Sequence, residues 1–257
     1  MAYGFFDMVS LDQITAYLGD YLRIKDVSDY GQAMNGLQLE NNGAVHRIAA
    51  AVDACEVVMK SAVNQEADLL LVHHGLFWNT TPLTGAMYRK VRDAIEGNLA
   101  VYSAHLPLDI HPKVGNNVLL AKALGLKGLK PFMPIKGQPA GLTGSCSLSR
   151  EALRNQLSSI LGSAVHLCAG GPARPRKVGV VTGGAGSEVA RAAAEGVDTF
   201  ITGEGPHWSY TLAEELGVNV LYGGHYATET FGVKGLAAHL SKRFKLPWVF
   251  IDHPTGL

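Results

Sequence analysis

The sequence predicts an α/β protein in which sheets are layered between helices, and three observations support this fold class. Short aliphatic runs typical of buried strands alternate along the chain with segments of helical periodicity. Polar residues follow the ends of several of these runs, where open α/β sheets bind ligands. A strand-helix-strand pattern also occurs twice, which indicates an internal duplication.

The composition excludes several classes of protein. The chain has 257 residues, of which 47% are hydrophobic and 17% are charged, as expected for a soluble protein with a sizeable core. Lys and Arg together number 22, as do Asp and Glu. This balance argues against a strong nucleic-acid binder, although a local basic patch at Arg174, Arg176 and Lys177 keeps that class open.

The location follows from what the sequence lacks. Its three cysteines, Cys55, Cys146 and Cys168, form no C-x-x-C pair, which indicates a reduced compartment without disulfides or thiolate zinc sites. The first residues carry no basic region typical of a secretory signal. No apolar run approaches the roughly 20 residues that a membrane span needs. We therefore expect a cytoplasmic protein that does not bind membranes.

The first half of the chain contains well-marked elements. Ser10-Leu11-Asp12-Gln13 fits a capping box, and apolar residues then follow at helical spacing to Tyr21. Asn35-Gly36 is a turn pair. The remaining expected elements are a strand at 48–52, a short helix at 57–62, a strand entering His73-His74, a helix at 87–95, a strand at 99–103, a loop at 104–109 and a helix at 116–124.

The second half begins with a change in composition. Residues 128–144 are rich in proline and glycine, and we interpret them as a domain junction. The expected elements that follow are helices at 151–161, 188–195 and 208–216, a long helix that ends near Phe244, and strands at 164–167, 177–181, 199–202, 218–222 and 248–251.

The internal repeat brings polar residues into register. In each half the unit spans 20 residues between matched points, from 47 to 67 and from 177 to 197. In each half the next strand ends in a histidine that is followed four positions later by a carboxylate, in the pairs His105–Asp109 and His225–Glu229. Chance explains a repeated strand pattern more easily than this second agreement.

The polar residues at the strand ends suit a metal centre. Neutral imidazoles with carboxylates and no thiolates favour Zn, Fe, Mn, Co or Ni, and the set is large enough for two ions. Two ions about 3.5–4 Å apart can polarise a phosphoryl or carbonyl oxygen. The register of the repeat favours this interpretation over buried structural histidines. The set consists of His73, His74, His105, Asp109, Glu204, His225 and Glu229.

Five motifs resemble those of the Nif-three-like proteins, also called GTP cyclohydrolase 1 type 2 homologues. They are HHGLFW at 73–78, HLPLD at 105–109, NGLQ at 35–38, ITGE at 201–204 and GHYATE at 224–229. The resemblance extends from about Asn35 to Asp252. It implies two intertwined α/β domains, a dinuclear metal centre and a toroidal homohexamer. Met34 is a departure, because relatives usually have proline before this NGLQ motif.

The resemblance also implies roles for individual residues. A metal-binding domain would comprise residues 1–128 and about 220–257, a second domain about 129–219, and both would contribute to a cleft. His105 is expected to orient a ligand or water rather than to bind metal. The implied metal ligands are His73, His74, Asp109, His225 and Glu229, with Glu229 as the bridge.

Other candidates have weaker signals. His105, His207 and Glu204 are candidates for assisting catalysis, and no catalytic residue is assigned. The glycine-rich segment 182–186 favours a tight turn over a phosphate cradle, because it lacks the full dinucleotide fingerprint. Phe77 and Trp78 are expected to pack between domains rather than to wall a pocket.

Two functions remain open at this point. The first is a metal-dependent hydrolase of a nucleotide, a phosphoester or a cyclic amide, and the family name suggests GTP ring opening. The second is a hexameric scaffold or regulatory binding protein in which two divalent metal ions are structural. A small-molecule substrate belongs to the first function only.

Overall fold

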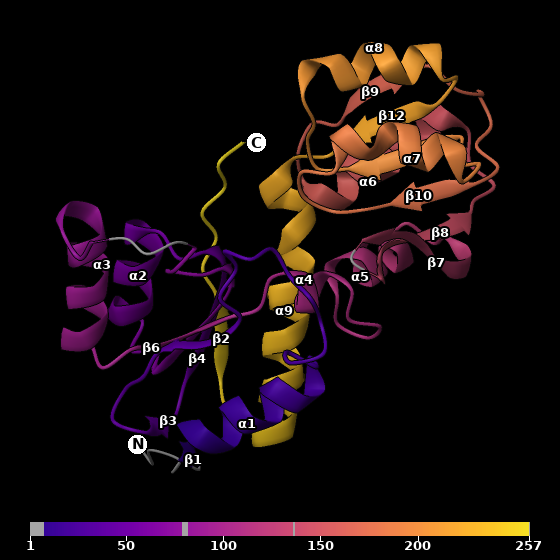
Figure 1. Ribbon diagram of the computed structural model, residues 1–257. Helices are drawn as coiled ribbons and strands as arrows, with labels where there is room; N and C mark the ends of the chain where they lie inside the picture. Colours follow the sequence, from indigo (N-terminus) through magenta and orange to yellow (C-terminus); the bar gives the residue numbers. More distant parts are fainter. Residues whose placement is uncertain (1–7, 79–81, 136, 257) are drawn as a thin grey trace. The chain divides into compact units, whose positions relative to one another are not determined.

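The computed structural model describes residues 8–78, 82–135 and 137–256 of the chain (Figure 1). It divides into two compact units. Unit 1 comprises the residues up to Leu108 together with 232–253, and unit 2 comprises 109–231 together with the residues from Pro254 onward. The domain boundaries near 128 and 220 that the resemblance implies stay a prediction.

Unit 1 contains a five-stranded sheet in the order β13-β4-β5-β6-β2. The first four of these strands are parallel to their neighbours, and β2 runs antiparallel to β6 at the edge. The turn pair at Asn35-Gly36 thus leads directly into an edge strand that the sequence did not indicate. The strands are β2 (Gly36–Leu39), β4 (Ile48–Asp53), β5 (Leu69–His74), β6 (Ala100–Ser103) and β13 (Trp248–Phe250).

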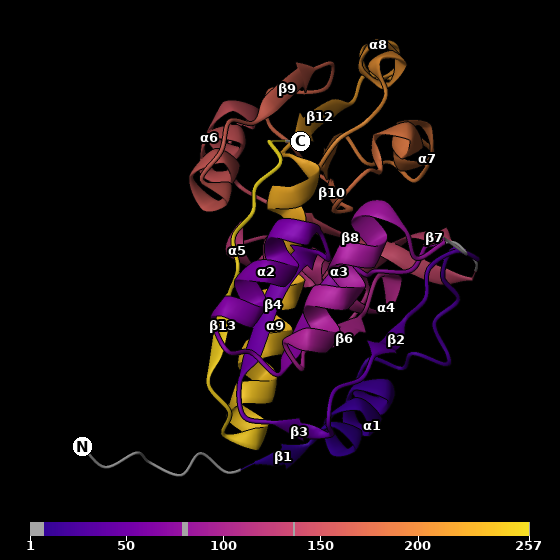
Figure 2. The ribbon, with the colours of Figure 1, turned by 90° about the vertical axis from the view of Figure 1, so that its left-hand side faces the viewer.

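One face of this sheet is covered by α2 (Glu56–Asn64) and α3 (Gly85–Glu96), which lie side by side (Figures 1 and 2). Alternate residues of the strands, such as Leu70, Val72 and Val101, are buried against these helices. This alternation follows from the period of two residues along a strand. Residues 69–73 of β5 are buried on both faces of the sheet, as the continuous apolar run before His73 predicts.

The other helices of unit 1 come from both ends of the chain. Helix α1 (Leu11–Tyr21) begins where the capping box predicts, and the Ser10 side chain accepts a hydrogen bond from the Gln13 amide. Its Tyr21 ring stacks on His239 of α9 (His225–Phe244), with the ring centroids 4.2 Å apart. The segment expected as a loop at 104–109 contains the short helix α4 (Leu106–Asp109). Strands β1 (Val9–Ser10) and β3 (Ala44–Val45) form a separate antiparallel pair.

Unit 2 contains a six-stranded sheet in the order β7-β8-β10-β11-β12-β9. Its three central strands β10, β11 and β12 are parallel, and the flanking strands are antiparallel to their neighbours. The sheet is therefore mixed, whereas the sequence indicates parallel layers. The strands are β7 (Lys127–Ile135), β8 (Gln138–Ser145), β9 (His166–Ala169), β10 (Val178–Val180), β11 (Thr199–Thr202) and β12 (Asn219–Tyr222).

Helices cover both faces of this second sheet. Ile201 and Leu221 pack on the side of α5 (Asn116–Ala123) and α6 (Arg150–Leu161). Their strand neighbours Phe200 and Val220 pack on the opposite side, with α7 and α8. Unit 2 is thus an α/β/α layer structure, in agreement with the predicted fold class. The last two helices are α7 (Val189–Ala194), which follows the short 3-10 turn η1 (Gly186–Glu188), and α8 (His207–Glu215).

The proline- and glycine-rich segment 128–144, interpreted from its composition as a domain junction, contains the two paired strands of a β hairpin. Strand β7 lies at the edge of the sheet, and its Pro131 and Pro134 pair with Leu142 and Pro139 of β8. Proline has no backbone N–H, and an edge strand tolerates this loss because one of its sides has no partner strand. Gly137, between the strands, has a φ of 79°, which favours glycine.

The two units share an order of elements. Strands and helices follow as β4-α2-β5-α3-β6 in unit 1 and as β10-α7-β11-α8-β12 in unit 2, and in each case the three strands are parallel neighbours. This agreement is consistent with a duplication, whose common origin stays a prediction.

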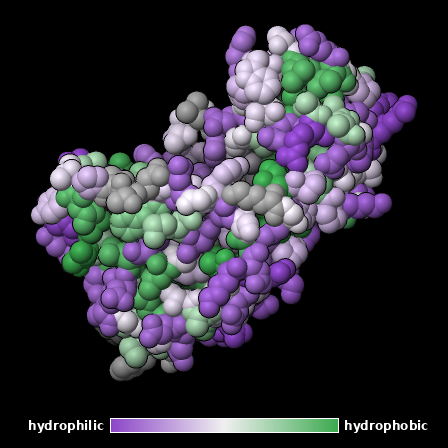
Figure 3. Space-filling model, in the orientation of Figure 1, coloured by the Kyte–Doolittle hydropathy of each residue, from purple (hydrophilic) through white to green (hydrophobic). Residues whose placement is uncertain are grey.

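The surface of the described residues mixes polar and apolar side chains (Figure 3). Hydrophobic side chains gather over α2 and α3, where Val57 and Ile95 are exposed, and over α8. None of the described helices combines the length and the apolar character that crossing a bilayer requires.

Candidate metal centre

The end of β5 places two histidines side by side. His73 is fully buried, and its Nδ1 lies 3.0 Å from the carbonyl oxygen of Ala104. The Nδ1 of His74 lies 2.8 Å from Oδ1 of Asp53, which is its register partner on β4. Consecutive strand residues start out on opposite faces, yet the two rings are only 4.7 Å apart between centroids. Both rings can therefore serve one site.

His105, directly after β6, joins this pair. Its Nδ1 lies 2.9 Å from Oδ1 of Asp29, whose side chain is 5% exposed. Asp29 also accepts hydrogen bonds from the Leu106 amide and from the side chain of Asn35. Burial alone raises the pKa of Asp29, but the hydrogen bonds from His105 and Asn35 bring it below its usual range. Asp29 thus stays charged and fixes the ring of His105.

Unit 1 therefore contains a group of three imidazoles. Ring nitrogens of His73, His74 and His105 all lie within 4.8 Å of one another, which is close enough for one metal ion. This places His105 among the possible ligands, whereas the sequence predicts an orienting role. Trp78 packs edge-on against His105 at 4.9 Å between centroids, so within unit 1 it forms part of the wall around the imidazoles.

Unit 2 contains a second group. His225 is the first residue of α9, and its Nε2 lies 3.2 Å from Oε2 of Glu229 one helical turn later. The shared helix face is the one that the i,i+4 spacing predicts. Carboxylate oxygens of Asp109 and Glu229 lie within 4.8 Å of each other. Asp109 is fixed by a hydrogen bond of 2.8 Å from the Asn116 side chain and by one from the Thr182 hydroxyl.

The glycine-rich segment 182–186 packs closely against the Glu229 side chain. Gly183 has a φ of +71°, and a Cβ atom at this position would overlap with the Glu229 carboxylate. The Gly183 amide donates a hydrogen bond of 3.1 Å to the Thr228 hydroxyl. The loop therefore makes a close backbone approach to a candidate ligand, which only glycine permits.

Two carboxylates determine the charge at His225. Burial lowers the pKa of this imidazole, but hydrogen bonds and charges from Glu229 and then Glu204 raise it to about 9. Oε1 of Glu204 lies 2.8 Å from Nδ1 of His225. The position thus favours a positive charge, whether this is a proton or a metal cation.

One arrangement is common to all four histidines of the two groups. In each, Nδ1 lies within hydrogen-bonding distance of an oxygen acceptor, so that the neutral ring carries its lone pair on Nε2. Metal-binding histidines show this arrangement, because the acceptor orients the ring and increases its basicity. The residues present therefore fit a divalent metal ion. The pairs are His73–Ala104, His74–Asp53, His105–Asp29 and His225–Glu204.

Sequence reasoning missed Asp29 and Asp53 as acceptors. Asp53 was detectable, because it follows the predicted strand at 48–52 and so lies near the end of the neighbouring strand that carries His74. Asp29 gives no periodic signal. His207 is exposed at the first residue of α8, and the ligand-type groups found among the described residues do not include it.

These features define a class of protein, a mixed α/β fold with histidine and carboxylate groups that can hold a metal ion. The chain belongs to the Duf34/NIF3 (NGG1p interacting factor 3) family, whose model matches residues 9–256. The resemblance inferred from the motifs is thereby confirmed.

Several relatives match along almost the whole chain. A Deinococcus radiodurans protein named GTP cyclohydrolase 1 type 2 homolog is 41% identical over 252 residues, which cover 97% of this chain and 95% of the relative. The crystal structure of TTHA1606 from Thermus thermophilus has a TM-score of 0.89 at 40% identity, with 97% and 100% of the chains covered. Reduced HcgD from Methanocaldococcus jannaschii has a TM-score of 0.85 at 27% identity, with 96% and 99% covered.

Proposed function

We propose that this chain is a dinuclear divalent-metal protein that hydrolyses a small substrate. Its metal ligands would be His73, His74, Asp109, His225 and Glu229, so the proposal requires the histidine pair of unit 1 and the ligands of unit 2 to bind at one centre. The observation that carries the proposal is the oxygen acceptor at Nδ1 of every candidate histidine. In metal-binding histidines such an acceptor fixes the tautomer and the orientation of the ring.

The side chains have distinct roles in this proposal. Two bound ions would polarise a phosphoryl or carbonyl oxygen and activate a water molecule. Glu229, with two carboxylate oxygens, is suited to bridge them. Asp53 and Glu204 hold the rings of His74 and His225 in their ligating orientation. His105, fixed by Asp29, would take up a proton at Nε2 and, once protonated, donate a hydrogen bond to a substrate oxygen.

The names of the relatives and the chemistry of paired divalent ions support a small set of substrate classes. Relatives are named GTP cyclohydrolase 1 type 2 homolog, which supports a nucleotide as the first candidate. Phosphoesters and cyclic amides are the next candidates, because their oxygens are also polarised by paired divalent ions. The ions would come from Zn, Fe, Mn, Co and Ni, which suit histidine and carboxylate ligands. We place this activity in the cytoplasm.

The experiment combines metal analysis with activity. The protein is purified without chelator and without nickel affinity, its metal content is measured, and it is assayed with GTP, a general phosphodiester and a cyclic amide. We expect about two divalent ions per chain and turnover of one substrate class. The metal content and the turnover should both be lost in the double variant His73→Ala with Glu229→Ala. Both should be retained in the control His46→Ala with Glu214→Ala, because His46 and Glu214 are exposed. Turnover that survives the first double variant contradicts the proposal.

A scaffold with structural metals is the second candidate function. It is favoured by the family description, which names an interacting factor, and by the exposed apolar residues on α2, α3 and α8. In a homohexamer, the particle mass in solution would be six times the 27.4 kDa of one chain. If a chelator dissociates this particle and no substrate is turned over, the metals are structural.

A further inference from the structure

Two aromatic side chains of unit 1 lie against His105. The ring of Trp78 packs edge-on against this imidazole, with 4.9 Å between the centroids. The ring of Tyr30 lies 5.9 Å from the same imidazole between centroids and is tilted against it by 48°. Both distances fall within the roughly 4.5–7 Å at which aromatic rings attract one another. Tyr30, Trp78 and His105 thus form one aromatic surface beside the imidazoles of His73 and His74.

The segment that carries Tyr30 is held firmly against His105. The Tyr30 amide donates a hydrogen bond of 2.6 Å to Oδ1 of Asp29, the carboxylate that also orients the ring of His105. The Asn35 side chain donates to Asp29 and accepts a hydrogen bond of 2.7 Å from the His105 amide. Within the segment, the Ala33 amide donates to the Tyr30 carbonyl. The position of Tyr30 is therefore set by the same groups that position His105.

The exposure of Tyr30 differs from that of the groups that hold it. The side chains of Asp29 and His105 are 5% and 14% exposed, whereas Tyr30 is 52% exposed. A single exposed apolar residue is common and needs no explanation. Tyr30, however, offers an open ring next to the candidate site on a segment that is already ordered. Such a segment binds a ligand without the entropy cost of ordering a loop.

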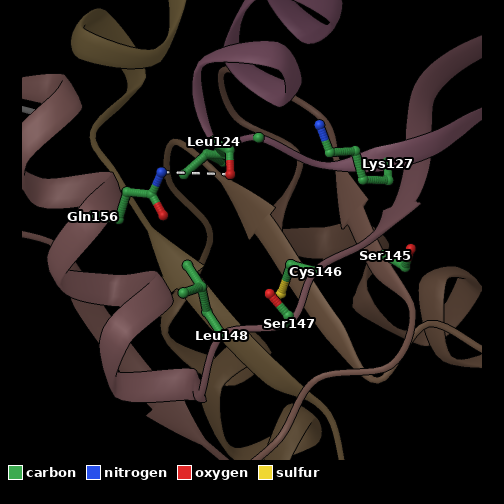
Figure 4. Close-up of a pocket in the computed structure, with 8 residues that line it drawn as sticks. Leu124, Lys127, Ser145, Cys146, Ser147, Leu148 and Gln156 are labelled. Atoms are coloured by element: carbon green, nitrogen blue, oxygen red, sulfur yellow. Dashed lines mark hydrogen bonds between the residues drawn. The ribbon is translucent and has the colours of Figure 1, made fainter.

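The cavity of unit 2 offers no comparable surface. It has a volume of about 440 Å³, and its lining includes Leu124, Lys127, Cys146 and Gln156 (Figure 4). Among the described residues, this lining contains no aromatic side chain. The Gln156 side chain already donates a hydrogen bond to the Leu124 carbonyl. A planar ring would therefore find no stacking partner in this cavity.

We propose that the aromatic surface binds a planar heteroaromatic ring of the substrate, and that this ring stacks on Tyr30. Aromatic side chains hold bases in this way, because every base has a π face. The inference rests on the proposed function and narrows its substrates to compounds with a heteroaromatic ring, such as nucleotides. A saturated cyclic amide has no π face and would not be held. Tyr30 is thus a residue that determines specificity.

The test compares guanosine 5′-monophosphate with ribose 5-phosphate, which lacks the base, by titration calorimetry with the full chain. We expect the nucleotide to bind saturably and about ten-fold more tightly than the sugar phosphate, because only the nucleotide can stack. Tyr30→Ala should weaken nucleotide binding about ten-fold, whereas Tyr30→Phe, which keeps the ring, should bind as the wild type does. Tyr88→Ala on α3 is the matched control, because Tyr88 is also 52% exposed, and it should have no effect.

A fluorescence measurement locates the bound ring. A base held beside Trp78 should quench the tryptophan fluorescence of the chain. The quenching should disappear in Trp78→Phe and persist in Trp208→Phe, which changes an exposed tryptophan on α8. Quenching that survives Trp78→Phe, or nucleotide binding without any quenching, would place the base elsewhere and overturn the proposal.

The remaining outcomes separate this proposal from the proposed hydrolase. Binding is measured with and without a chelator, and turnover is measured in a separate assay. Binding that depends on Tyr30 without any turnover contradicts the hydrolase but not the ring site. Nucleotide binding unchanged in Tyr30→Ala contradicts the ring site alone, as does equal binding of ribose 5-phosphate or the lack of saturable nucleotide binding. Because Tyr30 is exposed, Tyr30→Ala should melt as the wild type does, so weaker binding would not reflect unfolding.

Discussion

At the scale of single residues, Gly183 is the position where the backbone most directly limits a candidate ligand. Gly183 and Gly217 both have positive φ, but an added Cβ would overlap with Glu229 at Gly183 and meets nothing within 4 Å at Gly217. We expect Gly217→Ala to cost about 1 kcal/mol of backbone strain and Gly183→Ala about 3 kcal/mol, because overpacking adds to the strain. Urea denaturation of both variants measures the difference.

Metal analysis separates strain from displacement of the ligand. Gly183→Ala should lose metal, since Glu229 must move, and Gly217→Ala should retain it. Equal stability and equal metal content in the two variants would show that the close approach to Glu229 has no consequence.

Asp29 is the second residue whose environment leads to a prediction. Its carboxylate is buried and accepts hydrogen bonds from His105, the Leu106 amide and Asn35. Asp29→Asn should lower the free energy of unfolding by about 2–3 kcal/mol, because the new amide group meets donors instead of acceptors. The control Asp26→Asn alters an exposed ion pair and should change stability by about 0.5 kcal/mol or less. A similar effect of the two variants in urea denaturation would contradict this role.

At the scale of elements, helix caps provide a matched comparison. Ser149 at the start of α6 accepts a hydrogen bond from the Ala152 amide, whereas Thr84 at the start of α3 makes no such bond. We expect Ser149→Ala to cost about 1 kcal/mol and Thr84→Ala a few tenths. Thermal denaturation of the two variants tests this order, and the reverse order would contradict it.

The ion pair between Glu56 of α2 and Arg89 of α3 is expected to weaken at low pH. Hydrogen bonds from Arg89 and then Lys60 lower the pKa of Glu56 to about 2. Since the folded value is depressed, the contribution to stability is present above the unfolded pKa, about 4.3, and disappears as the pH falls through about 2. Arg89→Ala should return the pKa of Glu56 towards its usual range, and Lys60→Ala should do so to a lesser extent. An NMR titration of the carboxylate measures both.

At the scale of the whole molecule, bound metal should contribute to stability. A ligand that binds only the folded state raises the free energy of unfolding, by about 2.7 kcal/mol at a hundred times its dissociation constant. We therefore expect a chelator to lower the melting temperature and an added divalent ion to restore it. The double variant His73→Ala with Glu229→Ala should not respond. A wild type that loses its metal without any change in melting would show that the ions do not hold the fold together.

The sequence alone determined much of the chain's local structure. Aliphatic runs marked β4 and β5, because strands buried on both faces favour apolar residues along their length. The capping box marked the start of α1, and the spacing of His225 and Glu229 placed both on one face of α9. The motifs were sufficient to identify the family. These features depend on contacts between residues close in the chain.

Only the tertiary structure decided which distant residues meet. Asp29 reaches His105 across 76 positions, and no local pattern encodes such a partner. Residues 128–144 have the composition of a linker, yet they form a hairpin, because proline is compatible with a strand once that strand lies at the edge of a sheet. The buried Tyr102 hydroxyl likewise finds no hydrogen-bond partner among the described residues, and only the packing around it decides this. Local propensity sets the elements, whereas burial and hydrogen bonding between distant segments select the partners of each polar group.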